Sequence, residues 1–295
     1  MQSKFPRSFV VLLPFMAVIA MLPGCEGGAI VGKGKTRLQG DDGAAVDIVR
    51  VPLEAKKYGT VTGKIVYDGQ APARVPQDMG GNTGQCHADG ANEWENFKQD
   101  WMVSGNGGVK NVVVYLQPPS GKFFDLPEDQ RKPKDQVVER QPRCSFIDRV
   151  FLLFPSYYDG KEQKPTGQQF VIVNDAPFSH NYRLNVDPEV NMGGAAIMPP
   201  GAKETFTLKP QAKPISLDCN IHAWMHAYGF VLEHPYAAVT KDDGTFVIEN
   251  VPLDVELQVV AWHEAAGFFG EGGNAGKKMT LTDKQVLELP KLKAK

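Results

Sequence analysis

The sequence predicts an all-β fold on two observations. The chain has 295 residues, of which 30 are Gly and 22 are Pro, and its apolar segments are short and bounded by Gly, Pro, Asp or Asn. No long stretch repeats with the 3.6-residue period of an amphipathic helix. Short apolar runs between turn residues are typical of strands, so we expect a predominantly β chain.

The expected strands follow one another along most of the chain. They lie within residues 60–69, 109–116, 149–154, 170–174, 212–219, 225–233 and 244–251. A single short helical piece is expected around residues 92–98.

The N-terminal residues are typical of a targeting segment. Lys4 and Arg7 precede an apolar stretch, residues 8–22, that is short and interrupted by Pro, so it does not predict a membrane span. The sequence Leu-Pro-Gly-Cys that ends at Cys25 resembles the lipobox of bacterial lipoproteins. This resemblance implies removal of a signal peptide, residues 1–24, and lipidation of Cys25. Without lipidation, Cys25 would be a small residue near a cleavage point.

A lipid-anchored chain would face the periplasm or cell envelope, which is an oxidising compartment. Residues 25–58 show no sustained period and are expected to be a tether. Residues 1–24 hold two of the 32 basic residues and none of the 34 acidic ones, so the processed chain has a net charge of −4. It has no basic stripe, and nucleic acid is therefore not an expected partner.

Four side chains that can bind a metal fall in two segments. Cys219, His222 and Met225 follow the spacing Cys-x-x-His-x-x-Met, and His180 ends the apolar segment that begins at Phe170. One thiolate, two imidazoles and a weak axial thioether are the ligands of blue-copper sites. The sequence thus predicts one mononuclear copper site that carries single electrons.

Strand alternation explains how these ligands would meet. Ile215, Leu217 and Cys219 share one face of the expected strand, so Cys219 ends that strand pointing inward. A short turn then brings back His222, and Met225 begins the next strand.

The step Ser-His180-Asn181 and the Cys-His-Met loop resemble those of the cupredoxins, with the loop spacing of amicyanin. The resemblance covers residues 137–233 and implies a Greek-key β-sandwich or barrel. It also implies a type 1 copper site, with Asn181 holding the ligand loops together, and electron exchange with redox partner proteins rather than enzyme activity. The family places the loop His near the surface, so an apolar docking patch is expected around Trp224.

Other interpretations stay open. Buried Cys and Met are common core residues, so the four side chains could be ordinary core, or the fold could keep a site that no longer binds metal. The chain could also be a non-redox module that binds carbohydrate or protein. A copper enzyme would need a second metal at His226 or His263. We expect His226 to be a structural or surface residue and His263 to be a packed, hydrogen-bonding residue instead.

Two cysteines remain, Cys86 and Cys144. In an oxidising compartment two remaining thiols are expected to form a disulfide, and the alternative is a pair of free buried thiols.

The segments that flank the copper-binding region resemble the two halves of a carboxypeptidase-regulatory, transthyretin-like β-sandwich. Residues 60–72 with 108–116 resemble the first half, and residues 239–264 resemble the second, with a turn at Gly244 that uses its positive φ. The resemblance implies one split sandwich, residues 59–118 plus 235–290, around the inserted cupredoxin. Alternatively, residues 59–118 add strands to the copper domain.

The expected strand after Met225 is apolar on both faces. Ala227, Gly229 and Val231 lie on one face, and Tyr228, Phe230 and Leu232 lie on the other. A strand of this kind is buried on both sides, so we expect its second face to meet the flanking sandwich.

Overall fold

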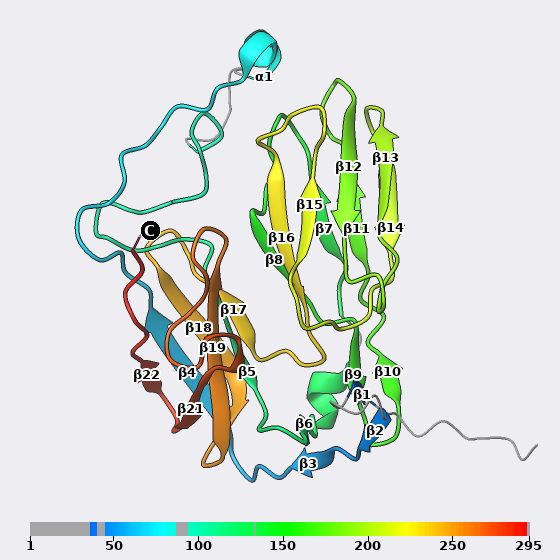
Figure 1. The fold of residues 1–295 in the computed structure, drawn as a ribbon, viewed down its shortest axis with the longest axis vertical. Helices are drawn as coiled ribbons and strands as arrows, with labels where there is room; N and C mark the ends of the chain where they lie inside the picture. Colours follow the sequence, from blue (N-terminus) through cyan, green and yellow to red (C-terminus); the bar gives the residue numbers. More distant parts are fainter. Residues whose placement is uncertain (1–35, 40–44, 87–93, 133, 294–295) are drawn as a thin grey trace, which may run out of the picture. The chain divides into compact units, whose positions relative to one another are not determined.

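The structure is a computed structural model that describes residues 36–39, 45–86, 94–132 and 134–293. Nearly all of its regular structure is strand, as Figure 1 shows, and the prediction of an all-β chain is confirmed. The sheets that the described strands form are open, so none of them closes into a barrel.

Residues 137–231 form two sheets that share a core. The three-stranded sheet has the order β14 (Lys203–Phe206), β11 (Phe170–Val173), β7 (Val137–Arg140). The five-stranded sheet has the order β13 (Gly194–Met198), β12 (His180–Asn185), β15 (Ile215–Asp218), β16 (His226–Val231), β8 (Val150–Leu153). Phe151 of one sheet stacks on Phe170 of the other, with ring centroids 4.6 Å apart. We call this pair of sheets the first sandwich.

A second pair of sheets, the second sandwich, combines strands from both ends of the described chain. One sheet has the order β17 (Ala237–Val239), β5 (Val113–Gln117), β19 (Glu256–His263), β20 (Gly267–Phe269), and β21 (Lys277–Thr280) also pairs with β19. The other sheet has the order β18 (Thr245–Pro252), β4 (Tyr58–Lys64), β22 (Gln285–Leu287). Val61, Val114, Phe246 and Leu257 share its core. Strands before and after the first sandwich therefore pair directly with each other.

The turn expected at Gly244 is present. Gly244 has a φ of +81°, and its N–H donates to the carbonyl of Lys241 at 2.9 Å. A Cβ at this position would lie 2.3 Å from the carbonyl oxygen of Ile65, so only glycine fits.

Shorter elements complete the described chain. They are β1 (Thr36–Gln39), β2 (Ala45–Ile48), β3 (Val51–Leu53), β6 (Lys122–Phe124), β9 (Ser156–Tyr158), β10 (Gln163–Pro165), α1 (Thr83–Cys86) and three 3₁₀ turns at Gly80–Asn82, Glu128–Arg131 and Gly273–Ala275.

The structure differs from two sequence-based expectations. The expected tether, residues 25–58, overlaps the folded region. Within it, β3 pairs in parallel with β6, and Leu53 is buried in the core of the second sandwich. The expected helical piece at 92–98 is not a helix where it is described, since residues 94–96 form a turn and Phe97 bridges to Pro76. Both outcomes depend on contacts that are distant in sequence.

The two sandwiches share a third apolar cluster, and they belong to one compact unit that spans residues 33–295. Phe230 of β16 and Val150 of β8 pack with Tyr115 of β5 and Trp262 of β19. On the other face of β16, Ala227 and Val231 belong to the core of the first sandwich. The prediction that β16 is buried on both faces is confirmed.

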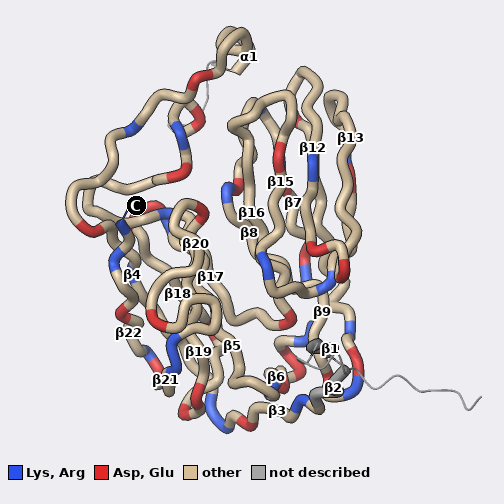
Figure 2. The backbone as a smooth tube through the Cα atoms, in the orientation of Figure 1, with Lys and Arg blue, Asp and Glu red and all other residues tan. Residues whose placement is uncertain are grey.

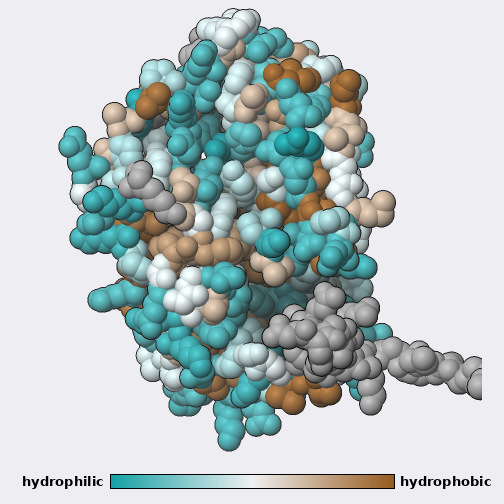
Figure 3. Space-filling view, viewed as in Figure 1, coloured by the Kyte–Doolittle hydropathy of each residue, from teal (hydrophilic) through white to brown (hydrophobic). Residues whose placement is uncertain are grey.

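The surface is mixed in charge and in hydropathy. Figure 2 shows basic and acidic residues interspersed along the described elements. On the face in Figure 3 the hydrophobic areas are small and separate. Among the described residues, no helix has the length and apolar character needed to cross a membrane.

Candidate metal centre

The loop between β15 and β16 supplies three of the predicted ligands. Cys219 follows the last residue of β15, and its N–H donates to the carbonyl of Met225 at 3.1 Å. The N–H of Met225 in turn donates to the carbonyl of His222 at 2.9 Å. These two bonds close the loop, so that Cys219 and His222 turn toward the same point.

The fourth predicted ligand, His180, begins the neighbouring strand β12. Arg183 of β12 pairs with Asp218 of β15, so the start of β12 lies beside the ligand loop. The side-chain oxygen of Asn181 accepts hydrogen bonds from the N–H of Asn220 at 2.6 Å and of Ile221 at 3.3 Å, and from the thiol of Cys219 at 3.2 Å. Asn181 thus joins β12 to the loop.

His180, Cys219 and His222 present three donor atoms to one another. The Sγ of Cys219 lies 3.9 Å from the Nδ1 of His180 and 3.9 Å from the Nδ1 of His222, and the two Nδ1 atoms are 3.1 Å apart. In a triangle with these sides, the equidistant point lies about 2.1 Å from each corner, which matches typical metal–nitrogen and metal–sulfur bonds of about 2.0–2.3 Å. The spacing therefore fits a single transition-metal ion.

Burial favours the neutral form of both imidazoles. His180 is fully buried and His222 is 2% exposed. The pKa of His180 falls to about 4, first because burial disfavours the imidazolium and second because charge on His222 would repel it, while the backbone carbonyl of Arg143 opposes the shift. Burial also lowers the pKa of His222. A neutral imidazole keeps the lone pair that a metal requires.

Met225 is 1% exposed and belongs to the same apolar cluster as Cys219. The side chain of Phe178, which sequence reasoning did not single out, packs near both imidazoles, with its ring centroid 5.2 Å from that of His180 and 6.2 Å from that of His222. Its position two residues before His180 was the available signal, because both residues then lie on the same side of an extended chain.

His222 is covered rather than near the surface, which corrects the expectation from the family resemblance. Its Nε2 lies 3.7 Å from the Sγ of Cys144, and its ring centroid is 5.3 Å from that of Trp224. The indole N–H of Trp224 donates to the carbonyl of Cys144 at 2.9 Å. Of the residues expected in the docking patch, Ile221 and Ala223 are exposed and Trp224 is half-buried, and docking of a partner there stays a prediction.

A disulfide joins Cys86 to Cys144, with an S–S distance of 2.03 Å. It brings the segment that precedes β8 and the C-terminus of α1 against the ligand loop. Sequence pattern could not show this neighbourhood, because neither segment has a strand period.

The other described histidines have partners outside the centre. His226 bonds to Asp218 at 2.7 Å. His263 stacks near Trp101 with ring centroids 4.5 Å apart, and His234 accepts from the N–H of Tyr236 at 3.2 Å. Within the described residues, groups of three metal-binding side chains are found in two places, and both contain His222.

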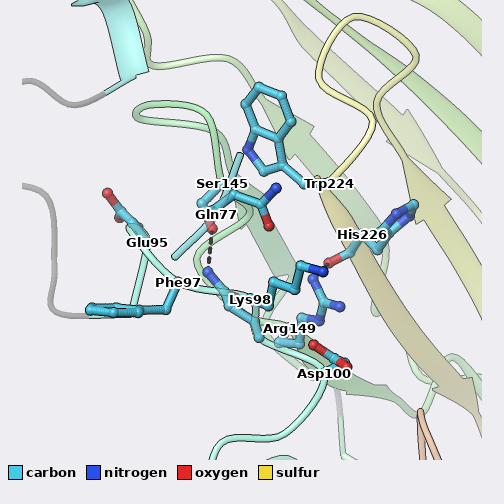
Figure 4. Close-up of a pocket in the computed structure, with 10 residues that line it drawn as sticks. Gln77, Glu95, Phe97, Lys98, Asp100, Ser145, Arg149, Trp224 and His226 are labelled. Carbon is cyan, nitrogen blue, oxygen red and sulfur yellow. Dashed lines mark hydrogen bonds between the residues drawn. The ribbon is translucent and has the colours of Figure 1, made fainter. Parts of the chain in front are cut away.

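A pocket of about 320 Å³ opens beside the ligand loop (Figure 4). It is lined by Trp224, His226 and Arg149, and by five residues of another segment: Glu95, Phe97, Lys98, Gln99 and Asp100. Arg149 also donates to the carbonyl of His226 at 3.2 Å. The remaining lining residues include Gln77 and Ser145.

The predicted signal peptide, residues 1–24, and the predicted lipidation site, Cys25, lie outside the described residues, as does His87.

No family model matches the chain, and no curated protein matches it. Solved structures to which it is similar include a copper-containing nitrite reductase from Thermus scotoductus, with 17% identity, a TM-score of 0.25 and coverage of 33% of this chain and 22% of that chain. A purple cupredoxin from Nitrosopumilus maritimus has 10% identity, a TM-score of 0.24 and coverage of 33% and 99%. Amicyanin from Paracoccus versutus has 15% identity, a TM-score of 0.25 and coverage of 40% and 97%. This chain therefore spans about a fifth of the nitrite reductase and nearly all of the two smaller proteins.

Proposed function

We propose that this chain is an electron-transfer protein with one type 1 copper ion held by His180, Cys219 and His222, and by Met225 as a weak fourth ligand. The observation that carries the proposal is the triangle of three buried donor atoms, whose sides of 3.9, 3.9 and 3.1 Å suit one metal ion. A lipid on Cys25 would keep the protein at a membrane facing the periplasm or cell envelope, where it would meet redox partner proteins.

The donor chemistry favours copper. One thiolate and two imidazoles around an open plane, with a thioether nearby, form the ligand set of blue-copper proteins. When bound, copper would supply a one-electron couple, since soft sulfur suits Cu(I) and imidazole suits both oxidation states.

The chain's own residues would hold the donors in place before metal arrives. Asn181 fixes Cys219 and the start of the ligand loop through three hydrogen bonds. Burial keeps His180 and His222 neutral, and Phe178 packs near both rings. A site that changes little between oxidation states favours electron transfer.

An anaerobic copper titration of the purified full chain tests the proposal, followed by absorbance and electron paramagnetic resonance. We expect one copper per chain, an intense blue colour and a narrow copper hyperfine splitting. Cys219→Ser should abolish the colour, while His226→Ala, which changes a histidine outside the triangle, should keep it. A colourless wild-type protein whose Cys219 is freely alkylated after copper loading would refute the assignment.

Metal stoichiometry separates an electron carrier from a copper enzyme. A copper oxidase or reductase would bind more than one copper tightly, with part of it lost on His263→Ala. A non-redox binding module would instead bind the same carbohydrate or protein partners in Cys219→Ala as in the wild type. We expect the wild-type chain to bind one copper ion, and we expect Cys219→Ala to lose the reaction with redox partners.

Mass spectrometry of the membrane-extracted protein tests the anchor. We expect an acylated N-terminal Cys25 and release of Cys25→Ser into the soluble fraction. A processed chain with an unmodified Cys25 would contradict this part of the proposal.

A further inference from the structure

The imidazole of His222 lies between two groups of metal-binding atoms. Its Nδ1 faces His180 and Cys219, and its Nε2 lies 3.7 Å from the Sγ of Cys144. The ligand atoms of Cys86, Cys144 and His222 all lie within 4.8 Å of one another. The second group is therefore a dithiol and an imidazole, closed in this structure by the disulfide.

The two cysteines of the second group are buried. Cys86 is 2% exposed and Cys144 is 4% exposed, and both share an apolar cluster with Met79 and Phe146. The bond from Trp224 to the carbonyl of Cys144 holds that backbone against the ligand loop. Two thiols released here would remain next to His222 rather than turning into solvent.

We propose that reduction of the Cys86–Cys144 disulfide creates a second site for a soft cation such as Cu(I), with the two sulfurs and the Nε2 of His222 as ligands. Thiolates are soft ligands that select Cu(I), and imidazole is also a suitable ligand for copper. The two electrons come from an external thiol or phosphine reductant, and each sulfur takes one proton. Cation binding then releases both protons, as thiolate coordination requires.

The two sites compete for one imidazole. A neutral imidazole has one lone pair, on Nδ1 or on Nε2, so His222 serves one site at a time. Whether Cys86 and Cys144 are oxidised or reduced thus decides whether Cu(I) can also find three ligands at the second group. The site exists independently of the proposed electron-transfer function.

The pocket in Figure 4 lies next to the backbone of Cys144, although neither cysteine lines it. Ser145, which follows Cys144, and Trp224, which bonds to the Cys144 carbonyl, both line it.

The test uses the full chain with His180→Ala and Cys219→Ser, which removes the first group and leaves the second intact. A Cu(I) titration against a coloured Cu(I) chelator is run under anaerobic conditions, before and after treatment with a phosphine. The phosphine becomes a phosphine oxide with oxygen from water and leaves no thiol ligand of its own. Thiol alkylation counts the cysteines released, and circular dichroism follows the fold.

We expect one additional Cu(I) per chain after reduction, lost when Cys86→Ser is added and bound at least about tenfold more weakly when His222→Ala is added. Equal binding with and without His222 would show an unstructured dithiol and overturn the proposal. A disulfide that resists the phosphine in the folded chain would overturn it as well. Because the first group is absent from this background, failure here leaves the type 1 assignment untouched.

Discussion

Asn181 shows how much a single buried amide can organise. Its side-chain oxygen accepts from two backbone N–H groups and from the Cys219 thiol, and the residue is 8% exposed. A buried donor that loses its acceptor costs about 1–3 kcal/mol, because it has already left water. The ligand loop therefore depends on an amide that need not touch a metal.

We predict that Asn181→Ala lowers the free energy of unfolding of the metal-free protein by about 1–3 kcal/mol, because it leaves the partly buried N–H groups of Asn220 and Ile221 without their acceptor. Urea unfolding followed by fluorescence measures the effect. Asn185→Ala is the matched control on the same strand, where an exposed amide bonds to Asp218, and should cost less than about 1 kcal/mol. Equal losses of unfolding free energy in the two variants would contradict the role of Asn181 in holding the ligand loop.

At this scale the sequence predicted which residues would converge and missed what covers them. His180, Cys219 and His222 meet because strand alternation and the loop spacing direct them inward. The contact between His222 and Cys144 depends on the path of an irregular segment, which no period encodes. Hence the donors could be predicted from sequence, whereas the burial of His222 could not.

Among the elements, β16 is packed against apolar side chains on both of its faces. Gly229, in its centre, has no room for a side chain, because a Cβ would lie 2.3 Å from the ring of Phe151 and 2.8 Å from Ile215. Phe151 is itself stacked on Phe170 and has little freedom to move. The strand therefore requires glycine for close approach.

We predict that Gly229→Ala lowers the free energy of unfolding by about 1–3 kcal/mol, the usual cost of overpacking a core. Chemical denaturation measures the change. Gly105→Ala serves as control, since a Cβ there would meet nothing within 4 Å. A stability of Gly229→Ala equal to that of the control would show that β16 can shift away from Phe151.

The longer apolar segments predicted strands correctly, whereas the three-residue strands were not predicted. Each expected strand segment contains an observed strand or part of one, such as β11 within 170–174. In contrast, β3 and β6 have three residues each and form only because they pair with each other. Pairing between distant short segments is a tertiary effect that leaves no local pattern.

Over the whole molecule, the two sandwiches are joined by apolar packing and by a partly buried ion pair. Arg149 precedes β8 and Glu264 follows β19, and their side chains form two bonds of 2.8 and 2.6 Å. The Arg149 guanidinium lies near His263, whose pKa falls to about 4, first through burial and then through this positive charge, while Asp100 opposes the shift. Burial lowers the pKa of His234 to about 3.

We predict that metal-free protein loses stability as the pH falls from about 6.5 toward 4. In this range the unfolded chain binds protons at His180, His222, His234 and His263 more readily than the folded chain does, so unfolding is favoured by up to about 1.4 kcal/mol per pH unit and per histidine. The raised pKa of buried Glu139 acts in the opposite direction, because the folded chain holds that proton more tightly. Thermal unfolding at several pH values measures the slope.

His263→Gln should make this pH slope shallower, and Gly105→Ala, whose added Cβ would meet nothing within 4 Å, should leave it unchanged. An identical slope in His263→Gln and wild type would contradict the assignment. The sequence identified His263 as a packed residue, and its coupling to Arg149 became evident only from the arrangement of the two sandwiches.

The pairing of β5 with β19 has a consequence for biosynthesis. Tyr115 pairs with Val260, so the first strands of the second sandwich leave the ribosome long before their neighbours are made. Residues 137–231, which lie between them, can finish their own sheets while β4 and β5 still expose open hydrogen-bonding edges. The nascent chain is then most prone to misassociation after its middle has matured and before its tail arrives, which is the interval when protection by a chaperone matters most.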